Sequence, residues 1–169
     1  MNTISLGDIT LRRWRPEDAQ ELAAAADNFK IWLNVRDGFP HPYSLDDAKA
    51  FIGSVGRLPG VFAIEIDGRA VGSIGYFPQS DVERLNAEIG YWLSEECWGR
   101  GIMSRAVKLL ADHIFANTEI IRLFATPFAY NPASMKVLEN AGFTKVGVLH
   151  NAAIKNNKII DVHYYELIK

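Results

Sequence analysis

The chain has 169 residues, of which 49% are hydrophobic, and this suits a single domain, residues 1–169, with a substantial core. Eighteen basic and twenty acidic side chains leave a formal charge of −2, so nucleic acid is not expected as a partner. The single cysteine, Cys97, excludes an intramolecular disulfide and a cysteine-cluster metal site, and we expect no metal. Because we see neither a signal-peptide pattern nor an apolar run of about 18 residues, the sequence predicts a cytoplasmic protein without a membrane partner.

The N-terminal quarter predicts a strand followed by helices. Residues 9–14 alternate apolar and polar side chains, as a half-buried strand does. Pro16 and two acidic residues then mark the first turn of a helix, and residues 28–35 predict a second, short one. Residues 36–43 contain a glycine and two prolines, so we expect a loop there.

The next segment predicts a helix and a hairpin. Ser44 followed by Asp47 resembles a capping box, which begins a helix expected to end near Gly56. Two apolar runs then flank Asp67-Gly68, a dipeptide typical of a tight hairpin turn. The hairpin strands are predicted at residues 61–66 and 70–77.

The second half predicts strands that alternate with helices. A strand over 86–93 contains Gly90, which suggests a bulge, and apolar residues at helical spacing predict a helix over 101–117. Asn131-Pro132 supplies an N-cap and a first-turn proline for a helix that ends before Gly142. The remaining strands are expected at 121–126, 143–149 and 159–168, the last two joined by a turn at 155–158. Together these elements predict an α+β domain with a mixed, mostly antiparallel sheet of about seven strands and about four helices.

Two glycines one residue apart lie between the strand at 86–93 and the following helix. Gly99 and Gly101 lack Cβ atoms where the backbone would approach a ligand, and a helix begins with unpaired N–H groups. Arg100 adds a positive charge. This combination is typical of an anion cradle, most often for a phosphate, although a tight turn without a ligand is the alternative.

Four motifs in a fixed order resemble the GCN5-related N-acetyltransferase (GNAT) superfamily, and within it the ribosomal-protein N-terminal (alanine/serine) acetyltransferases. They are Glu88-Ile-Gly-Tyr-Trp-Leu93, Trp98-Gly-Arg-Gly-Ile-Met103, Asn131-Pro-Ala-Ser134 and Ala141-Gly-Phe143. The resemblance covers nearly the whole chain. It implies a GNAT-like domain and an acyltransferase that moves the acetyl group of acetyl-CoA to a primary amine by direct attack in a ternary complex.

The resemblance also implies which residues bind acetyl-CoA. The pyrophosphate would lie on backbone N–H groups from Gly99 to Ser104, and the pantetheine arm would run beside the strand end at 91–93. The implied cofactor-binding set is Tyr91, Trp92, Leu93, Trp98, Gly99, Arg100, Gly101, Ile102, Met103, Ser104 and Asn131. Met103 stands where the family has glycine or alanine, so its side chain either crowds the cofactor or packs into the core.

Acetyl transfer to an amine requires a base, a group that stabilises the carbonyl oxygen and an acid for the leaving thiolate. By resemblance, Glu88 is the base, acting through a water, and a backbone N–H near residues 91–93 stabilises the oxygen. Ser134 could hydrogen-bond the departing sulfur, because Leu138 occupies the position where many members have a tyrosine acid. The structural alternatives are a strand-edge glutamate for Glu88 and a first-turn helix serine for Ser134.

Other reactive side chains carry weaker indications. Cys97 precedes a helix, but no histidine lies near it in sequence, so a covalent acetyl-enzyme is disfavoured. Four residues near the C-terminus either line the acceptor site or are structural: His150, His163, Tyr164 and Tyr165. Asp161 is frequent in the family, but its role does not follow from the sequence.

Three functions remain open at this level. The acceptor is most simply a protein N-terminal α-amine, or a lysine, which predicts an open groove between the 36–43 loop and the last hairpin. A small amine, such as an antibiotic or a polyamine, predicts a closed, acid-lined pocket. A non-catalytic acyl-CoA-binding domain is the third alternative, and the protein is expected to be a monomer or a homodimer.

Overall fold

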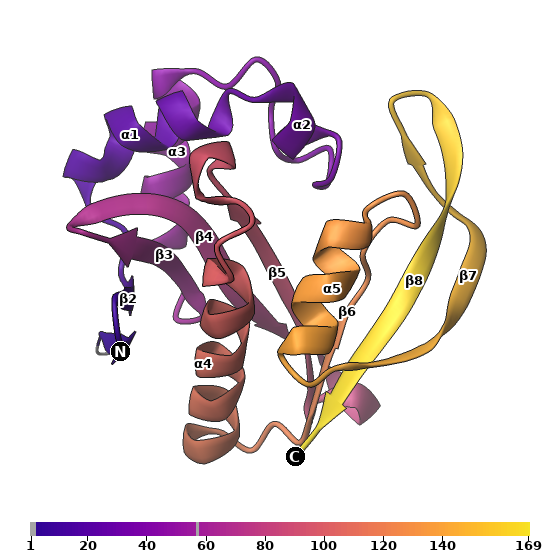
Figure 1. The fold of residues 1–169 in the computed structure, drawn as a ribbon. Coiled ribbons are helices and arrows are strands. Elements are labelled where there is room, and N and C mark those ends of the chain that lie inside the picture. The colour runs from indigo at the N-terminus through magenta and orange to yellow at the C-terminus, as the bar shows by residue number, and fades with distance from the viewer. Residues whose placement is uncertain (1–2, 57) are drawn as a thin grey trace. The chain divides into compact units, whose positions relative to one another are not determined.

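The computed structural model describes residues 3–56 and 58–169, and in them eight strands form one mixed sheet in the order β1-β2-β3-β4-β5-β6-β8-β7 (Figure 1). β5 and β6 pair in parallel, whereas β6–β8, β7–β8 and the successive pairs from β1 to β4 are antiparallel. The strands are β1 (Ile4–Leu6), β2 (Ile9–Arg12), β3 (Val61–Ile66), β4 (Arg69–Pro78), β5 (Asn86–Leu93), β6 (Arg122–Ala125), β7 (Thr144–Lys155) and β8 (Lys158–Ile168).

Five α-helices and three 3₁₀ turns are found in the described residues. They are α1 (Ala19–Ala26), α2 (Phe29–Trp32), α3 (Leu45–Val55), α4 (Ile102–Asn117) and α5 (Pro132–Asn140), with 3₁₀ turns η1 (Pro16–Asp18), η2 (Asp81–Glu83) and η3 (Glu95–Cys97). The α+β class is confirmed. In the described residues no helix is long and apolar enough to cross a membrane.

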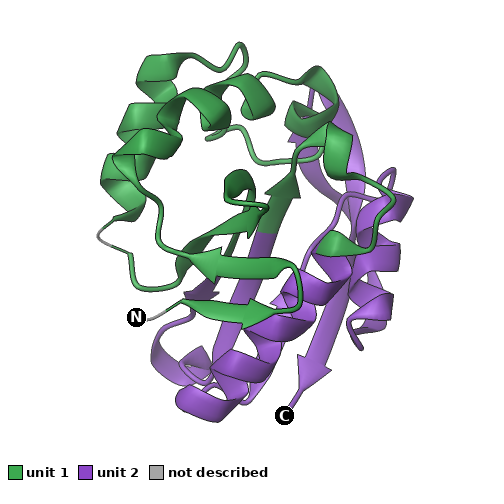
Figure 2. Ribbon diagram, turned by 60° about the vertical axis from the view of Figure 1, so that its left-hand side comes forward, with its two compact units in different colours: residues 1–75, 91–102 green, residues 76–90, 103–169 purple. Residues whose placement is uncertain are grey.

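The chain divides into two compact units, coloured separately in Figure 2. Unit 1 comprises residues 1–75 and 91–102, and unit 2 comprises residues 76–90 and 103–169. The boundary passes through β4, β5 and the first residue of α4, so each of these elements contributes residues to both units.

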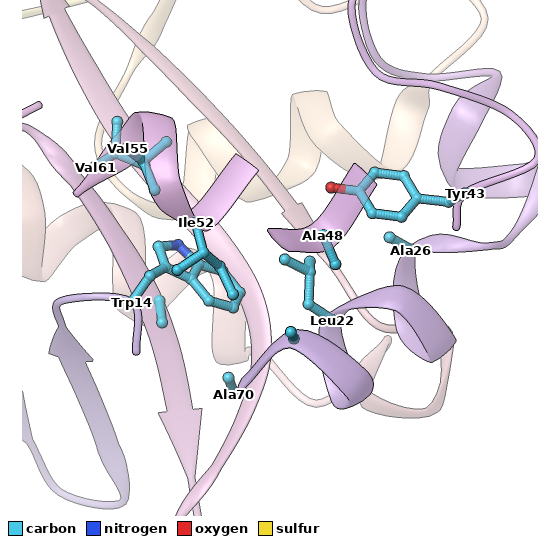
Figure 3. Packing of buried hydrophobic residues seen from close by; sticks show 11 residues of the cluster. Trp14, Leu22, Ala26, Tyr43, Ala48, Ile52, Val55, Val61 and Ala70 are labelled. Carbon is cyan, nitrogen blue, oxygen red and sulfur yellow. The ribbon is translucent and has the colours of Figure 1, made fainter. Parts of the chain in front are cut away.

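Unit 1 has its core between two helices and the β3–β4 hairpin (Figure 3). The Ser44 hydroxyl accepts the Asp47 N–H at 3.1 Å and the Asp47 carboxylate accepts the Ser44 N–H at 2.8 Å, which confirms the capping box that begins α3. The apolar face of α3 packs against α1, and the ring of Trp14 meets Phe51 edge to face at 5.6 Å. Among the residues that the structure describes, the buried indole Nε1 of Trp14 has no hydrogen-bond partner.

A buried ion pair lies beside this core. Arg12 is 3% exposed and donates two hydrogen bonds to the Asp18 carboxylate, at 2.7 and 2.9 Å, and a further one to Glu65. Burial would raise the pKa of Asp18, but hydrogen bonds from the Arg12 guanidinium and the Arg15 N–H outweigh it and lower the pKa. Asp18 thus connects β2 and η1.

Unit 2 is built around α4, α5 and the last three strands. Ala106, Leu110 and Ile114 recur every four residues on α4 and are fully buried, as the helical spacing predicts. The Asn131 side chain accepts the Ser134 N–H at 3.2 Å, which confirms the N-cap of α5.

Several boundaries differ from the sequence prediction, and the strand count is eight rather than about seven. The additional strand, β1, has only three residues, Ile-Ser-Leu, and this run is too short for its alternation to identify a strand. The helix expected at Pro16 begins as a 3₁₀ turn, and the one expected over 28–35 is reduced to four residues. β7 extends to Lys155 because Asn156 and Asn157, with φ of 50° and 59°, form the whole turn.

Candidate functional site

The loop between β5 and α4, residues 98–104, is called the glycine loop below. Gly99 and Gly101 have φ of 71° and 69°, a left-handed conformation that residues with a Cβ adopt at a cost. A Cβ built on either glycine would find no atom within 4 Å, so conformation rather than space requires glycine at both positions. The two turns bring the chain directly into α4, whose first N–H groups have no intrahelical partner by helix geometry. The local structure therefore fits an anion, as the sequence predicted.

Trp98 fixes the glycine loop to the end of β5. Its indole Nε1 donates a hydrogen bond to the Leu93 carbonyl at 2.8 Å, although the Trp98 side chain is 43% exposed. The neighbouring Trp92 ring meets Phe39 edge to face at 5.7 Å, so the strand end also contacts the 36–43 loop. Sequence reasoning identified Trp98 and Trp92 as cofactor-binding candidates but did not find these contacts, because they depend on side-chain geometry.

Three of the predicted cofactor-binding residues are buried. Leu93, Ile102 and Met103 are 8%, 1% and 5% exposed, so their side chains do not reach a ligand at the surface of the loop. The burial of Met103 favours the interpretation as a core methionine.

Cys97 and Arg100 line a cavity of about 270 Å³ beside the β3–β4 turn. Arg69, also in its lining, forms ion pairs with Glu21 at 3.2 Å and Glu96 at 3.6 Å, so acidic groups offset its charge. Burial, and then Glu96, raises the pKa of the Cys97 thiol. The thiol is therefore protonated at neutral pH, which agrees with the prediction that Cys97 is not a nucleophile.

Glu88 lies in unit 2, on β5, and the residue is half-buried. Its Oε1 accepts a hydrogen bond from Thr126 Oγ1 at 3.0 Å, and its partner in the parallel register of β6 is Phe124. A carboxylate that accepts a hydroxyl hydrogen bond is held in one orientation, as a general base requires. The pairing of β5 with β6 runs from Asn86 to Glu88, and the bulge suggested at Gly90 stays a prediction.

Ser134 and Asn131 are brought together at the first turn of α5. The Ser134 N–H is bound to the Asn131 side chain, and Ser134 is half-buried. Leu138, one turn later, is completely buried in the core, and its aliphatic side chain has no proton to give to a leaving thiolate. Ser134 as a partner of the leaving sulfur, and Asn131 as a contact of pantetheine, remain predictions.

The four C-terminal candidates have different environments. Tyr165 is 1% exposed and donates its hydroxyl to Glu139 of α5 at 3.1 Å; burial and that carboxylate raise its pKa. Burial lowers the pKa of His163, which is neutral at pH 7. Tyr165 therefore has a structural environment, whereas Tyr164 stacks on Phe124 on the other surface of β8.

His150 lies in a bulge of β7, and Asp161 of β8 contacts this bulge. The register of β7 and β8 shifts between Leu149 and Ala153. There the Asp161 carboxylate accepts the Asn151 N–H at 2.8 Å and lies 3.1 Å from Nδ1 of His150. Asp161, whose role the sequence left open, thus stabilises the backbone of the last hairpin.

The sequence analysis missed the neighbours of Glu88. Phe124 and Arg122 belong to β6, and Thr126 directly follows that strand; Arg122 donates to Glu166 at 2.8 Å. Thr126 and Arg122 lie 38 and 44 positions from their respective hydrogen-bond partners, Glu88 and Glu166. Alternation within one strand indicates which residues share a face, but the register between strands is not encoded locally.

The chain was compared with protein families and with known relatives. The family model of the acetyltransferase (GNAT) domain matches residues 8–144. The chain is similar to the uncharacterised N-acetyltransferase p20 of Bacillus licheniformis, with 28% identity over 100% of this chain and 97% of the relative. It is also similar to YdaF of Bacillus subtilis, provisionally named a ribosomal N-acetyltransferase, with 30% identity over 95% of this chain and 91% of the relative.

A solved structure gives the same fold. RimL, a ribosomal L7/L12 alpha-N-protein acetyltransferase in complex with coenzyme A, superposes with a TM-score of 0.85 over 99% of this chain and 98% of that chain. The two sequences are 22% identical, so this likeness concerns the fold alone.

Proposed function

The chain belongs to the acetyltransferase (GNAT) domain family, and from that membership we propose that it transfers the acetyl group of acetyl-CoA to the α-amine of a protein N-terminus. N-acetyltransferase activity follows from the family and its relatives. The identity of the acceptor is the part that is proposed.

The glycine loop is the observation that carries this function. Two left-handed glycines followed directly by a 16-residue helix present backbone N–H groups to an anion. The pyrophosphate of acetyl-CoA is the natural ligand for such a loop, and the coenzyme A complex of RimL supports the same choice. Met103 does not oppose it, because its side chain is buried.

Glu88 is the proposed base. Acetyl-CoA supplies an acetyl thioester, which an amine attacks only after the amine has lost its proton. An α-ammonium group has a pKa near 8, so at neutral pH most of the acceptor arrives protonated. The Glu88 carboxylate, oriented by Thr126, would accept that proton through a water. Ser134 would hydrogen-bond the departing sulfur.

We prefer a protein N-terminus over a small amine as the acceptor because YdaF, matched along nearly its whole length, is provisionally named a ribosomal N-acetyltransferase.

In the described residues no group of three or more acidic, histidine or cysteine side chains could hold a metal ion.

The test combines binding with turnover. Calorimetric titration with acetyl-CoA is expected to give a dissociation constant of about 1 to tens of micromolar, roughly −6 to −8 kcal/mol. The protein is then incubated with acetyl-CoA and either N-terminal peptides, acetyl-blocked peptides that contain lysine, polyamines or aminoglycosides, and products are identified by mass spectrometry. Acetylation of the α-amine peptides supports the proposal, while faster transfer to a small amine contradicts the acceptor. Binding without turnover on any amine would instead indicate a non-catalytic acyl-CoA-binding domain.

A further inference from the structure

Strand register places an aromatic pair beside Glu88 within unit 2. Glu88 on β5 is opposite Phe124 on β6, and Phe124 is opposite Glu166 on β8. Directly paired residues share a face of the sheet, and alternation along β8 adds Tyr164 to that face. Tyr165 projects to the other face, where it binds Glu139 of α5. The face that carries Glu88 is therefore the one opposite α5.

The rings of Phe124 and Tyr164 are nearly parallel, and neighbouring side chains hold them in place. The Phe124 and Tyr164 ring centroids lie 5.3 Å apart and the ring planes differ by 9°. The guanidinium carbon of Arg122 lies 5.5 Å from each centroid. Arg122 also donates to Glu166 at 2.8 Å. We call the six residues Glu88, Arg122, Phe124, Thr126, Tyr164 and Glu166 the Glu88 face.

The charge of the Glu88 face suits a cation. Arg122 and Glu166 form an ion pair at 2.8 Å and offset each other's charge, and Glu88 adds a further carboxylate to the group. The Thr126 hydroxyl donates to this carboxylate, and the aromatic ring of Phe124 belongs to its register partner on β6. An ammonium group is attracted both by a carboxylate and by the electron-rich surface of an aromatic ring.

We propose that the stacked Phe124–Tyr164 pair, fixed by Arg122 and Glu166, holds the first residue of the acceptor beside Glu88 and so determines which N-termini are acetylated. This inference rests on the proposed function, because it assumes that Glu88 receives the proton of the acceptor amine. The α-ammonium group would meet the carboxylate while the first side chain lies on the rings. Acceptors with an apolar first side chain therefore gain contacts that glycine does not make.

The test measures steady-state kinetics of four proteins with peptides that differ only in their first residue. Tyr164→Ala removes a ring of the pair, Tyr164→Phe retains it, and Tyr165→Phe removes a hydroxyl from the opposite face. We expect Tyr164→Ala to raise KM for a methionine-first peptide about tenfold, which corresponds to about 1.4 kcal/mol. Its kcat and its KM for acetyl-CoA should change less than about threefold, within the range of a pure loss of acceptor binding.

The controls separate specificity from folding. Tyr164→Phe and Tyr165→Phe should keep the peptide KM within about twofold of wild type, and a glycine-first peptide should lose little in Tyr164→Ala. If Tyr164→Ala does not fold, Tyr164→Leu provides the same comparison with apolar volume retained. An unchanged peptide KM, or equal losses for glycine-first and methionine-first peptides, would overturn the inference while the proposed function stands. A wild-type protein that acetylates small amines but no peptide would overturn both.

Discussion

The glycine loop and the Glu88 face show two ways in which a chain builds a functional surface. The glycine loop consists of consecutive residues, and what it offers is main-chain N–H groups that two left-handed glycines orient. The Glu88 face collects side chains from three strands, with partners 38 and 44 positions apart in the sequence. The glycine loop should therefore keep its function after most side-chain changes and lose it when the backbone cannot adopt its conformation. The function of the Glu88 face should change after single side-chain substitutions.

Glu88→Gln is expected to have the largest effect. Glutamine keeps the size of the side chain and can still accept the Thr126 hydrogen bond, but it cannot take a proton. We expect kcat/KM to fall about 10²-fold or more, the usual range for a lost general base. The loss should be greatest at low pH, since at high pH the acceptor amine is already deprotonated. Acetyl-CoA affinity measured by calorimetry serves as the control and should not change, and a fall below about threefold in kcat/KM would remove Glu88 from the mechanism.

Gly101→Ala tests whether the conformation of the glycine loop is required for acetyl-CoA binding. Alanine at φ 69° is strained by about 1 kcal/mol or more, so the loop should leave its anion-binding conformation. We expect acetyl-CoA to bind about tenfold more weakly. Gly7→Ala is a matched control, because Gly7 also has a positive φ, 61°, and open space around its Cβ position, but lies in the β1–β2 turn. It should lower stability without affecting acetyl-CoA binding, and equal effects of both variants on affinity would contradict the role of the loop.

Gly72→Ala probes a glycine required by space rather than by conformation. A Cβ on Gly72 would lie 2.5 Å from the Trp92 carbonyl oxygen, so the backbone at the end of β5 would have to shift. We expect a loss of stability of about 1–3 kcal/mol, as for other overpacked sites. Gly53→Ala, in α3 with no atom within 4 Å of the added Cβ, should instead stabilise the protein by up to about 1 kcal/mol. Denaturant unfolding of both variants checks the pair, and the same sign for both would contradict the steric explanation.

The glycine loop was predictable from the sequence, whereas the Glu88 face was not, and the same difference holds elsewhere in the fold. Caps at Ser44 and Asn131, the turn at Asp67-Gly68 and the glycine loop were predictable, because each depends on residues within a few positions. The same reasoning suggested a bulge at Gly90, which stays a prediction, and it did not single out Gly72, where an added Cβ would lie 2.5 Å from the Trp92 carbonyl oxygen. A strand glycine indicates that something comes near, but only the packing of the neighbouring strand shows where.

The neighbours of Glu88 could not be predicted for a related reason. Thr126 and Phe124 appear in the sequence as the end of an ordinary short strand. Their position beside Glu88 depends on the register of β5 and β6, and a shift by one residue would send both side chains to the other face. A family resemblance supplied Glu88, but the residues around it had to come from the structure.

Asp161→Asn should have the smallest effect, because it changes one exposed charge in a hairpin whose register is otherwise fixed by strand pairing. In the folded protein the Asn151 N–H, and then His150, lower the pKa of Asp161. A carboxylate whose pKa falls on folding stabilises the protein above its unfolded pKa of about 3.9, and this contribution is lost as the pH falls through the folded value. Asparagine can still accept the Asn151 N–H but carries no charge. We therefore expect a small decrease in Tm at pH 7 that narrows below about pH 4, as Asp161 becomes protonated in the wild type. Thermal unfolding of both proteins from pH 7 to pH 3 measures it, and a difference that stays constant over this range would mean that Asp161 holds the bulge through its shape alone.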